Sequence, residues 1–114
     1  MSGSGHCMAY ITCPDSDTAL KLGHEMVDRQ LAACANVIPG MKSIYMWDGA
    51  PEVTSETILI LKTSERAYST LEDAVVASHP YEVPCVLKIP IDAGNPKYLT
   101  WLMSSLGRTE PGLT

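Results

Sequence analysis

The residues best suited to chemistry lie together in the short segment His79-Pro80-Tyr81-Glu82-Val83-Pro84. An imidazole is a good ligand for copper or zinc, and a nearby carboxylate can supply a second ligand. Pro80 keeps its predecessor, His79, out of the helical backbone region, so a helix is expected to end there. The two prolines therefore predict a stiff loop that fixes the directions of His79, Tyr81 and Glu82, which serves a binding site better than a core.

Each possible metal ligand also has a structural interpretation. His79 can bind a metal, or it can cap the preceding helix by bonding to the last carbonyl groups. Glu82 can be a second ligand or a loop carboxylate exposed to water. Cys34, at the start of an expected strand, can be a small buried thiol or can face His79 of a neighbouring subunit in an oligomer. The residue types alone leave these alternatives open.

Aromatic and charged residues in other segments suggest a groove. Tyr45, Trp47 and Trp101 can line a groove between subunits or pack within an interface. Glu56 and Lys62 have even spacing on one expected strand, so they share one face of it. Lys62 can pair with a carboxylate, hold an anionic ligand, or extend its charged end into solvent.

The elements that must position these residues follow from apolar spacing and from turn residues. Asp15 and Ser16 offer helix N-cap oxygens, Pro39-Gly40 predicts a bulge inside a long strand, and Asp48-Gly49 predicts a hairpin turn. Asn95-Pro96 predicts the start of a third helix. The expected strands are residues 7–12, 33–47, 55–63 and 83–91, and the expected helices are residues 16–30, 64–79 and 96–106.

This order predicts an α+β fold of the ferredoxin-like split βαβ type, β-α-β-β-α-β plus a C-terminal helix, with an antiparallel sheet. Right-handed crossovers place the first and third strands at the sheet centre. The continuous apolar run Ile58–Leu61 suits a central strand covered on both faces. The second strand is then a long edge, and a long bare edge favours association, so we predict a homo-oligomer.

Composition limits the partners and the compartment. The 114 residues predict one domain, 1–114, with a flexible start at residues 1–6 and a flexible tail at residues 108–114. A net charge of −5 disfavours nucleic acid, and no apolar run reaches the roughly 20 residues of a membrane span. Four cysteines without a Cys-x-x-Cys pair and the lack of a signal-peptide pattern predict reduced thiols and a cytoplasmic location.

Two other classes of protein share this strand order, but this chain lacks the residues on which their functions depend. Cys34 and His79 could form a nucleophile and a base. However, the first turn, Cys13-Pro14-Asp15, is acidic and lacks the arginine of an acylphosphatase anion loop. RNA-recognition domains stack bases on sheet aromatics, and the strand segment 57–61 contains no aromatic residue. We therefore expect neither catalysis nor RNA binding.

The chain resembles the CutA family of divalent-cation tolerance proteins from about Tyr10 to Trp101. The resemblance rests on several blocks in register rather than on any one motif. The blocks are Gln30-Leu31-Ala32-Ala33-Cys34-Ala35-Asn36, Ile38-Pro39-Gly40, Ser43-Ile44-Tyr45-Met46-Trp47-Asp48-Gly49, Ser55-Glu56, Leu61-Lys62-Thr63, His79-Pro80-Tyr81-Glu82-Val83-Pro84 and Asn95-Pro96-Lys97-Tyr98-Leu99-Thr100-Trp101.

The resemblance implies a homotrimer similar to the PII signalling proteins, copper or other divalent-cation binding, and a role in metal tolerance. Combined with the residue chemistry above, it favours His79, and Cys34 of a neighbouring subunit, as the metal ligands. It also implies ligand-binding grooves between subunits, lined by Tyr45, Trp47, Glu56, Lys62, Tyr81, Glu82 and Trp101. An alternative is a scaffold for an unidentified protein partner, with no physiological metal. In one respect the chain departs from the family pattern: Ile11 stands where some bacterial members have a first-strand cysteine proposed to bind copper, and Cys13 lies two residues further on.

Overall fold

The computed structural model describes residues 3–106 and has the expected order of elements. Its strands and helices are β1 (His6–Cys13), α1 (Ser16–Asp28), β2 (Cys34–Trp47), β3 (Ala50–Ser64), α2 (Tyr68–Ser78), β4 (Val86–Ile91) and α3 (Pro96–Ser104). The strands form one antiparallel sheet in the order β2-β3-β1-β4. The prediction that the first and third strands lie at the centre is therefore confirmed.

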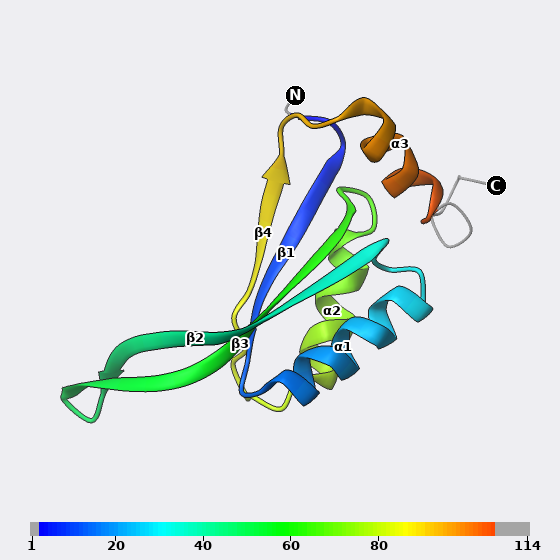
Figure 1. Cartoon of the computed structure of the whole chain (residues 1–114). Coiled ribbons are helices and arrows are strands. Elements are labelled where there is room, and N and C mark those ends of the chain that lie inside the picture. The colour runs from blue at the N-terminus through cyan, green and yellow to red at the C-terminus, as the bar shows by residue number, and fades with distance from the viewer. Residues whose placement is uncertain (1–2, 107–114) are drawn as a thin grey trace.

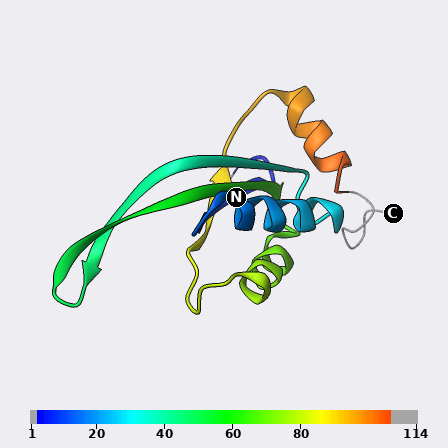
Figure 2. The ribbon, with the colours of Figure 1, turned by 60° about the horizontal axis from the view of Figure 1, so that its bottom comes forward.

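Helices α1 and α2 lie on the same face of the sheet (Figures 1 and 2). Helix α1 begins where the Asp15 side chain accepts a hydrogen bond from the Thr18 backbone N–H at 2.8 Å, which also lowers the pKa of this carboxyl. The helix ends before Gln30, whose backbone is left-handed with φ 58°. The face that α1 buries consists of Ala19, Leu22, Gly23 and Met26.

The core lies between these helices and one face of the sheet. Its sheet side consists of alternate residues of the two central strands: Cys7, Ala9, Ile11, Cys13, Leu59 and Leu61. The prediction that Ile58–Leu61 is covered on both faces is wrong for a single chain, because Ile58 and Ile60 point to the other face and are only half-buried. Helix α3 contacts one end of that other face, since Lys62 there donates a hydrogen bond to Tyr98.

The β2–β3 hairpin extends well beyond the rest of the sheet (Figures 1 and 2). Strand β1 pairs with residues 57–64 of β3, so residues 41–56 pair only with each other, and we call them the arm. The register shifts between Ile38 and Met41, as Pro39-Gly40 predicts, and Gly40 takes φ 84°, which favours glycine. The arm gives the chain a longest dimension of 50 Å against 25 and 22 Å.

Several element boundaries differ from the sequence prediction. Strand β3 begins at Ala50 rather than Ser55, because Pro51 is accommodated opposite Met46 near the hairpin turn. Helix α2 begins at Tyr68 because Ser64 belongs to β3, and its side-chain oxygen accepts a hydrogen bond from the Ala67 backbone N–H. Strand β4 begins only at Val86, after Pro84.

At the N-terminal end the structure differs from the sequence prediction, and the predictions for the C-terminal end fall outside the described residues. The expected flexible start included His6, but His6 belongs to β1 and is buried, with its ring 2.9 Å from both Ser4 Oγ and Leu99 O. The predicted helix end at Gly107 and the predicted tail at 108–114 lie outside the described residues.

Candidate functional site

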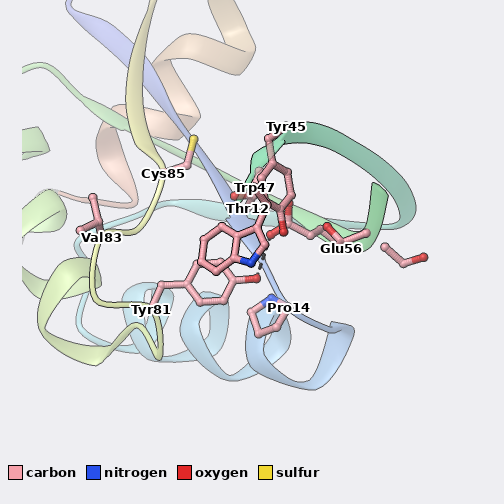
Figure 3. A pocket seen from close by; sticks show the side chains of 10 residues that line it. Thr12, Pro14, Tyr45, Trp47, Glu56, Tyr81, Val83 and Cys85 are labelled. Carbon is pink, nitrogen blue, oxygen red and sulfur yellow. Dashed lines mark hydrogen bonds between the residues drawn. The ribbon is translucent and has the colours of Figure 1, made fainter. Parts of the chain in front are cut away.

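A groove of about 430 Å³ lies where the arm leaves the sheet (Figure 3). The end of β1, the arm and the loop between α2 and β4 all contribute to its wall. The lining residues are Thr12, Pro14, Tyr45, Trp47, Thr54, Ser55, Glu56, Tyr81, Val83 and Cys85. Four residues that the sequence placed in a groove, Tyr45, Trp47, Glu56 and Tyr81, therefore come together within one chain.

Glu56 is the carboxylate of this groove. One of its oxygens accepts a hydrogen bond from Ser43 Oγ at 2.6 Å, and the other accepts one from the Tyr81 hydroxyl at 2.8 Å. Each carboxylate oxygen can accept a further bond, so Glu56 is oriented by the protein but retains capacity for a ligand. Among the described residues, no lysine, arginine or histidine lines the groove.

Tyr81 connects Glu56 to the proline-bounded loop. Burial, followed by the hydrogen bond to Glu56 and the negative charge of this carboxylate, raises the pKa of Tyr81 to about 12. The phenol therefore stays protonated at neutral pH and donates to Glu56. Sequence reasoning did not find Ser43, which lies opposite Thr54 in the arm and holds the other oxygen of Glu56.

His79 has a structural role beside the groove, because its ring connects β1 to the loop after α2. Its side chain is buried, with an exposed fraction of 7%. Nε2 lies 2.9 Å from the Thr12 carbonyl, and Nδ1 lies 3.1 Å from the backbone nitrogen of Tyr81. A carbonyl only accepts and a backbone N–H only donates, so these partners assign the proton to Nε2 and leave Nδ1 as the acceptor. His79 is also the C-cap residue of α2, but its ring bonds to β1 rather than to the last carbonyls of the helix.

The two predicted metal ligands lie apart within one chain. Cys34 pairs with Lys62 near one end of the central strands, whereas His79 bonds to Thr12, which pairs with Ile58 near the other end. Within residues 3–106, no group of three or more histidine, cysteine, aspartate or glutamate residues lies close enough together to hold a metal ion. One described chain therefore does not fit a complete metal site, and metal binding at His79 and Cys34 stays a prediction.

The first-strand residues that the family comparison singled out face the core. Ile11 and Cys13 share one face of β1, as their spacing predicted, and both are fully buried. Burial, followed by the charges of Asp15 and Glu56, raises the pKa of Cys13 to about 11. Cys13 is therefore a protonated thiol within the core of the single chain at neutral pH.

The remaining predicted groove residues lie elsewhere. Lys62 donates to the Tyr98 hydroxyl at 3.2 Å, and the rings of Tyr98 and Trp101 are 5.6 Å apart on α3. Tyr98 was missed from the sequence, although its spacing of three residues from Trp101 places both on one helix face. Glu82 is exposed and does not line the groove.

Comparisons with known proteins agree on one family. A family model described as "CutA1 divalent ion tolerance protein" matches residues 7–105. The divalent-cation tolerance protein CutA of Thermus thermophilus is 40% identical over 100 residues, which cover 88% of this chain and 97% of that protein. A CutA homolog of Xenopus laevis is 46% identical over 94 residues, which cover 82% of this chain and 62% of that protein.

Solved structures give the same result. The structure of the Thermus thermophilus protein aligns with a TM-score of 0.84 at 38% identity and covers 90% of this chain and 99% of that one. CutA from Xylella fastidiosa aligns with a TM-score of 0.87 at 33% identity, again with 90% and 99% coverage. The chain spans only 55% and 54% of the length of the chloroplastic relatives from rice and Arabidopsis.

Proposed function

Because this chain belongs to the CutA1 divalent ion tolerance family, we propose that it acts as a homotrimeric, non-catalytic divalent-cation tolerance protein. The observation that carries the trimer is the amount of apolar surface that a single chain leaves uncovered. The face of the arm opposite to the groove exposes Ile44, Met46 and Val53, with an exposed fraction of 70% for Ile44. Surfaces of this kind mark sites of protein association.

The sheet supports the same proposal. Its second face presents Ile38, Leu87 and Ile89, all exposed, beside the half-buried Ile58 and Ile60. Strand β2 is an edge strand along its length, and a long edge pairs readily with another chain. A trimer would cover both features.

Light scattering coupled to gel filtration tests the assembly. We expect a mass of three times the 12.3 kDa of one chain. Replacing Ile44 and Met46 in the arm with lysine should shift the mass towards that of the monomer. Leu20 is an exposed apolar residue of α1, and replacing it with lysine should leave the mass unchanged. A monomeric wild-type protein would refute the trimer.

We further propose that the trimer binds copper(II) or a similar divalent cation weakly at His79, with Cys34 contributed by a neighbouring subunit. Imidazole and thiolate both suit copper. Since the two residues lie at opposite ends of the sheet in one chain, only a second chain can bring them together. To bind a metal, His79 must give up either Thr12 or the Tyr81 N–H as its hydrogen-bond partner.

Calorimetric titration with copper(II) tests this site. We expect His79→Ala and Cys34→Ala each to weaken binding at least tenfold, and Cys85→Ala, which changes another half-buried thiol, to leave it unchanged. Unchanged binding in both variants would remove the assignment, although the trimer could still stand.

A non-catalytic role in a reducing compartment is part of the proposal. All four cysteines are free thiols, as a cytosolic location favours. None of the helices within residues 3–106 is long and apolar enough to cross a membrane. Cys7 resembles Cys13 in that burial raises its pKa to about 11, so neither thiol suits nucleophilic catalysis.

The alternative function is a scaffold for a protein partner, and the exposed arm is the observation that favours it. A trimer that leaves Ile44 and Met46 accessible would retain an apolar surface for a partner. Hydrogen exchange of the purified trimer separates the two cases: protected amides at residues 41–56 indicate self-association of the arm, and rapid exchange there indicates a surface left for a partner.

A further inference from the structure

Three aromatic side chains from two elements meet in the groove. Tyr45 and Trp47 come from β2, with ring centroids 6.5 Å apart and planes nearly perpendicular, and Tyr81 comes from the loop after α2. Figure 3 shows these rings gathered around the opening beside Glu56. Trp47 is 62% exposed, so its ring is available to a ligand. The electron-rich faces of aromatic rings attract cations, and cages of such rings bind alkylated ammonium groups.

The charge of the groove has one sign. Glu56 is its carboxylate, and no lysine, arginine or histidine of the described chain lines it. The nearby Lys42 donates to Ser55 Oγ at 2.6 Å, and Ser55 points to the other side of β3 from Glu56, because successive strand side chains alternate. Glu56 makes no ion pair within residues 3–106. The net charge of −5 also favours a cation over an anion.

The size and donors of the groove favour an organic cation over a bare metal ion. Its volume of about 430 Å³ is that of a small-molecule site. Only Glu56 and Cys85 among the lining residues are common metal ligands, which is too few for a metal site. Pro14 and Val83 complete the wall with apolar surface that suits alkyl groups.

We propose that this groove binds an organic ammonium ion, with Tyr45, Trp47 and Tyr81 around the alkylated nitrogen and Glu56 as its counter-ion. The hydrogen bonds from Ser43 and Tyr81 fix Glu56 before the ligand arrives, so little ordering remains on binding. The inference rests on the proposed function in one respect only: the trimer must leave the groove open. It does not depend on copper or on His79.

Choline is a suitable probe because an uncharged analogue of the same shape exists. In neohexyl alcohol a carbon atom replaces the quaternary nitrogen, so the pair differs mainly in charge. Fluorescence of a Trp101→Phe protein reports on Trp47 alone, since the chain has two tryptophans. We expect choline to change this fluorescence with millimolar affinity and neohexyl alcohol to bind at least tenfold more weakly. Equal binding of the two compounds, or no binding of choline, would overturn the proposal.

Variants then identify the residues. Glu56→Gln keeps the shape of the side chain and should weaken choline binding about tenfold, and Tyr45→Leu should weaken it several-fold. Asp28→Asn removes one negative charge from the exposed C-terminal end of α1, whereas the groove lies beside the other end of this helix, so it should have no effect at physiological salt. Choline binding that is equal in wild type and Glu56→Gln would also overturn the proposal.

Light scattering on the same samples keeps the two proposals separate. A monomer that still discriminates choline from neohexyl alcohol refutes the trimer and supports the ammonium site. A trimer that fails to discriminate them supports the assembly and refutes the ammonium site.

Discussion

Replacing His79 with alanine should destabilise the protein whether or not metal is present. The ring is buried and joins three parts of the chain: the end of α2, the Thr12 carbonyl of β1 and the Tyr81 N–H of the loop. Each hydrogen bond contributes about 0.5–1.5 kcal/mol of net stability. The lost packing of the buried ring adds a further ~1 kcal/mol or more. The expected loss in the free energy of unfolding is therefore about 2–4 kcal/mol.

Urea unfolding measures this loss, at one subunit concentration because association affects apparent stability. With a urea dependence of roughly 2 kcal/mol per molar, the midpoint should fall by about 1–2 M. Two conservative variants serve as controls. His79→Gln places a donor near Nε2 and can keep the bond to Thr12, whereas His79→Asn places an acceptor near Nδ1 and can keep the bond from Tyr81.

Each of these controls should recover part of the stability that alanine loses. A loss below about 1 kcal/mol in His79→Ala would refute the reasoning, because the two hydrogen bonds and the packing of the buried ring together must exceed that value. If that small loss came with abolished copper binding, His79 would be a metal ligand whose hydrogen bonds contribute little to the fold.

Three further predictions follow from buried groups. Burial raises the pKa of both Cys7 and Cys13 from 9.0 to about 11, so the folded chain holds more protons than the unfolded chain between these pH values. The free energy of unfolding should therefore fall as the pH rises from about 9 to about 11. The fall should be less steep in Cys13→Ala, which has one of these thiols fewer. A pH-independent free energy over that range would contradict the shift. Iodoacetamide should leave Cys7 and Cys13 unlabelled in native protein and label them in urea, as mass spectrometry can show. Gly23→Ala should destabilise the protein by roughly 1–2 kcal/mol despite better helix propensity, because its Cβ would lie 3.0 Å from the Cβ of Ala35 and 3.3 Å from Leu59 Cδ1. Urea unfolding measures this loss, and a stabilising Gly23→Ala would show that the helix can shift.

Local sequence signals predicted most of the fold. Asp15, the Pro39-Gly40 pair, Asp48-Gly49 and Asn95 each act within a few residues, and each marks the cap, bulge or turn that the structure contains. Signals that depend on distant partners were less informative. The run Ile58–Leu61 predicted a strand covered on both faces, but what covers its second face is not set by the run itself.

The candidate site shows the same contrast between local signals and those that depend on distant partners. The aromatic and acidic residues of the groove were identified by type, but their grouping depends on the bend of the arm towards the loop after α2. This bend brings Glu56 to Tyr81 and leaves Lys62 and Trp101 at another end of the sheet. Spacing along one strand placed Glu56 and Lys62 on one face, yet it could not show that different elements would contact each of them.

The register shift at Ile38/Met41 also divides the hairpin into two parts with different strand pairing. Residues 57–64 of β3 have strands on both sides, whereas arm residues 41–56 have only each other as backbone partners. An isolated two-stranded hairpin is marginally stable in water. In a free chain the arm should therefore open far more often than the central strands, and its amide exchange should slow as protein concentration rises. The arm would thus act as a local reporter of assembly, with a boundary near Gly40.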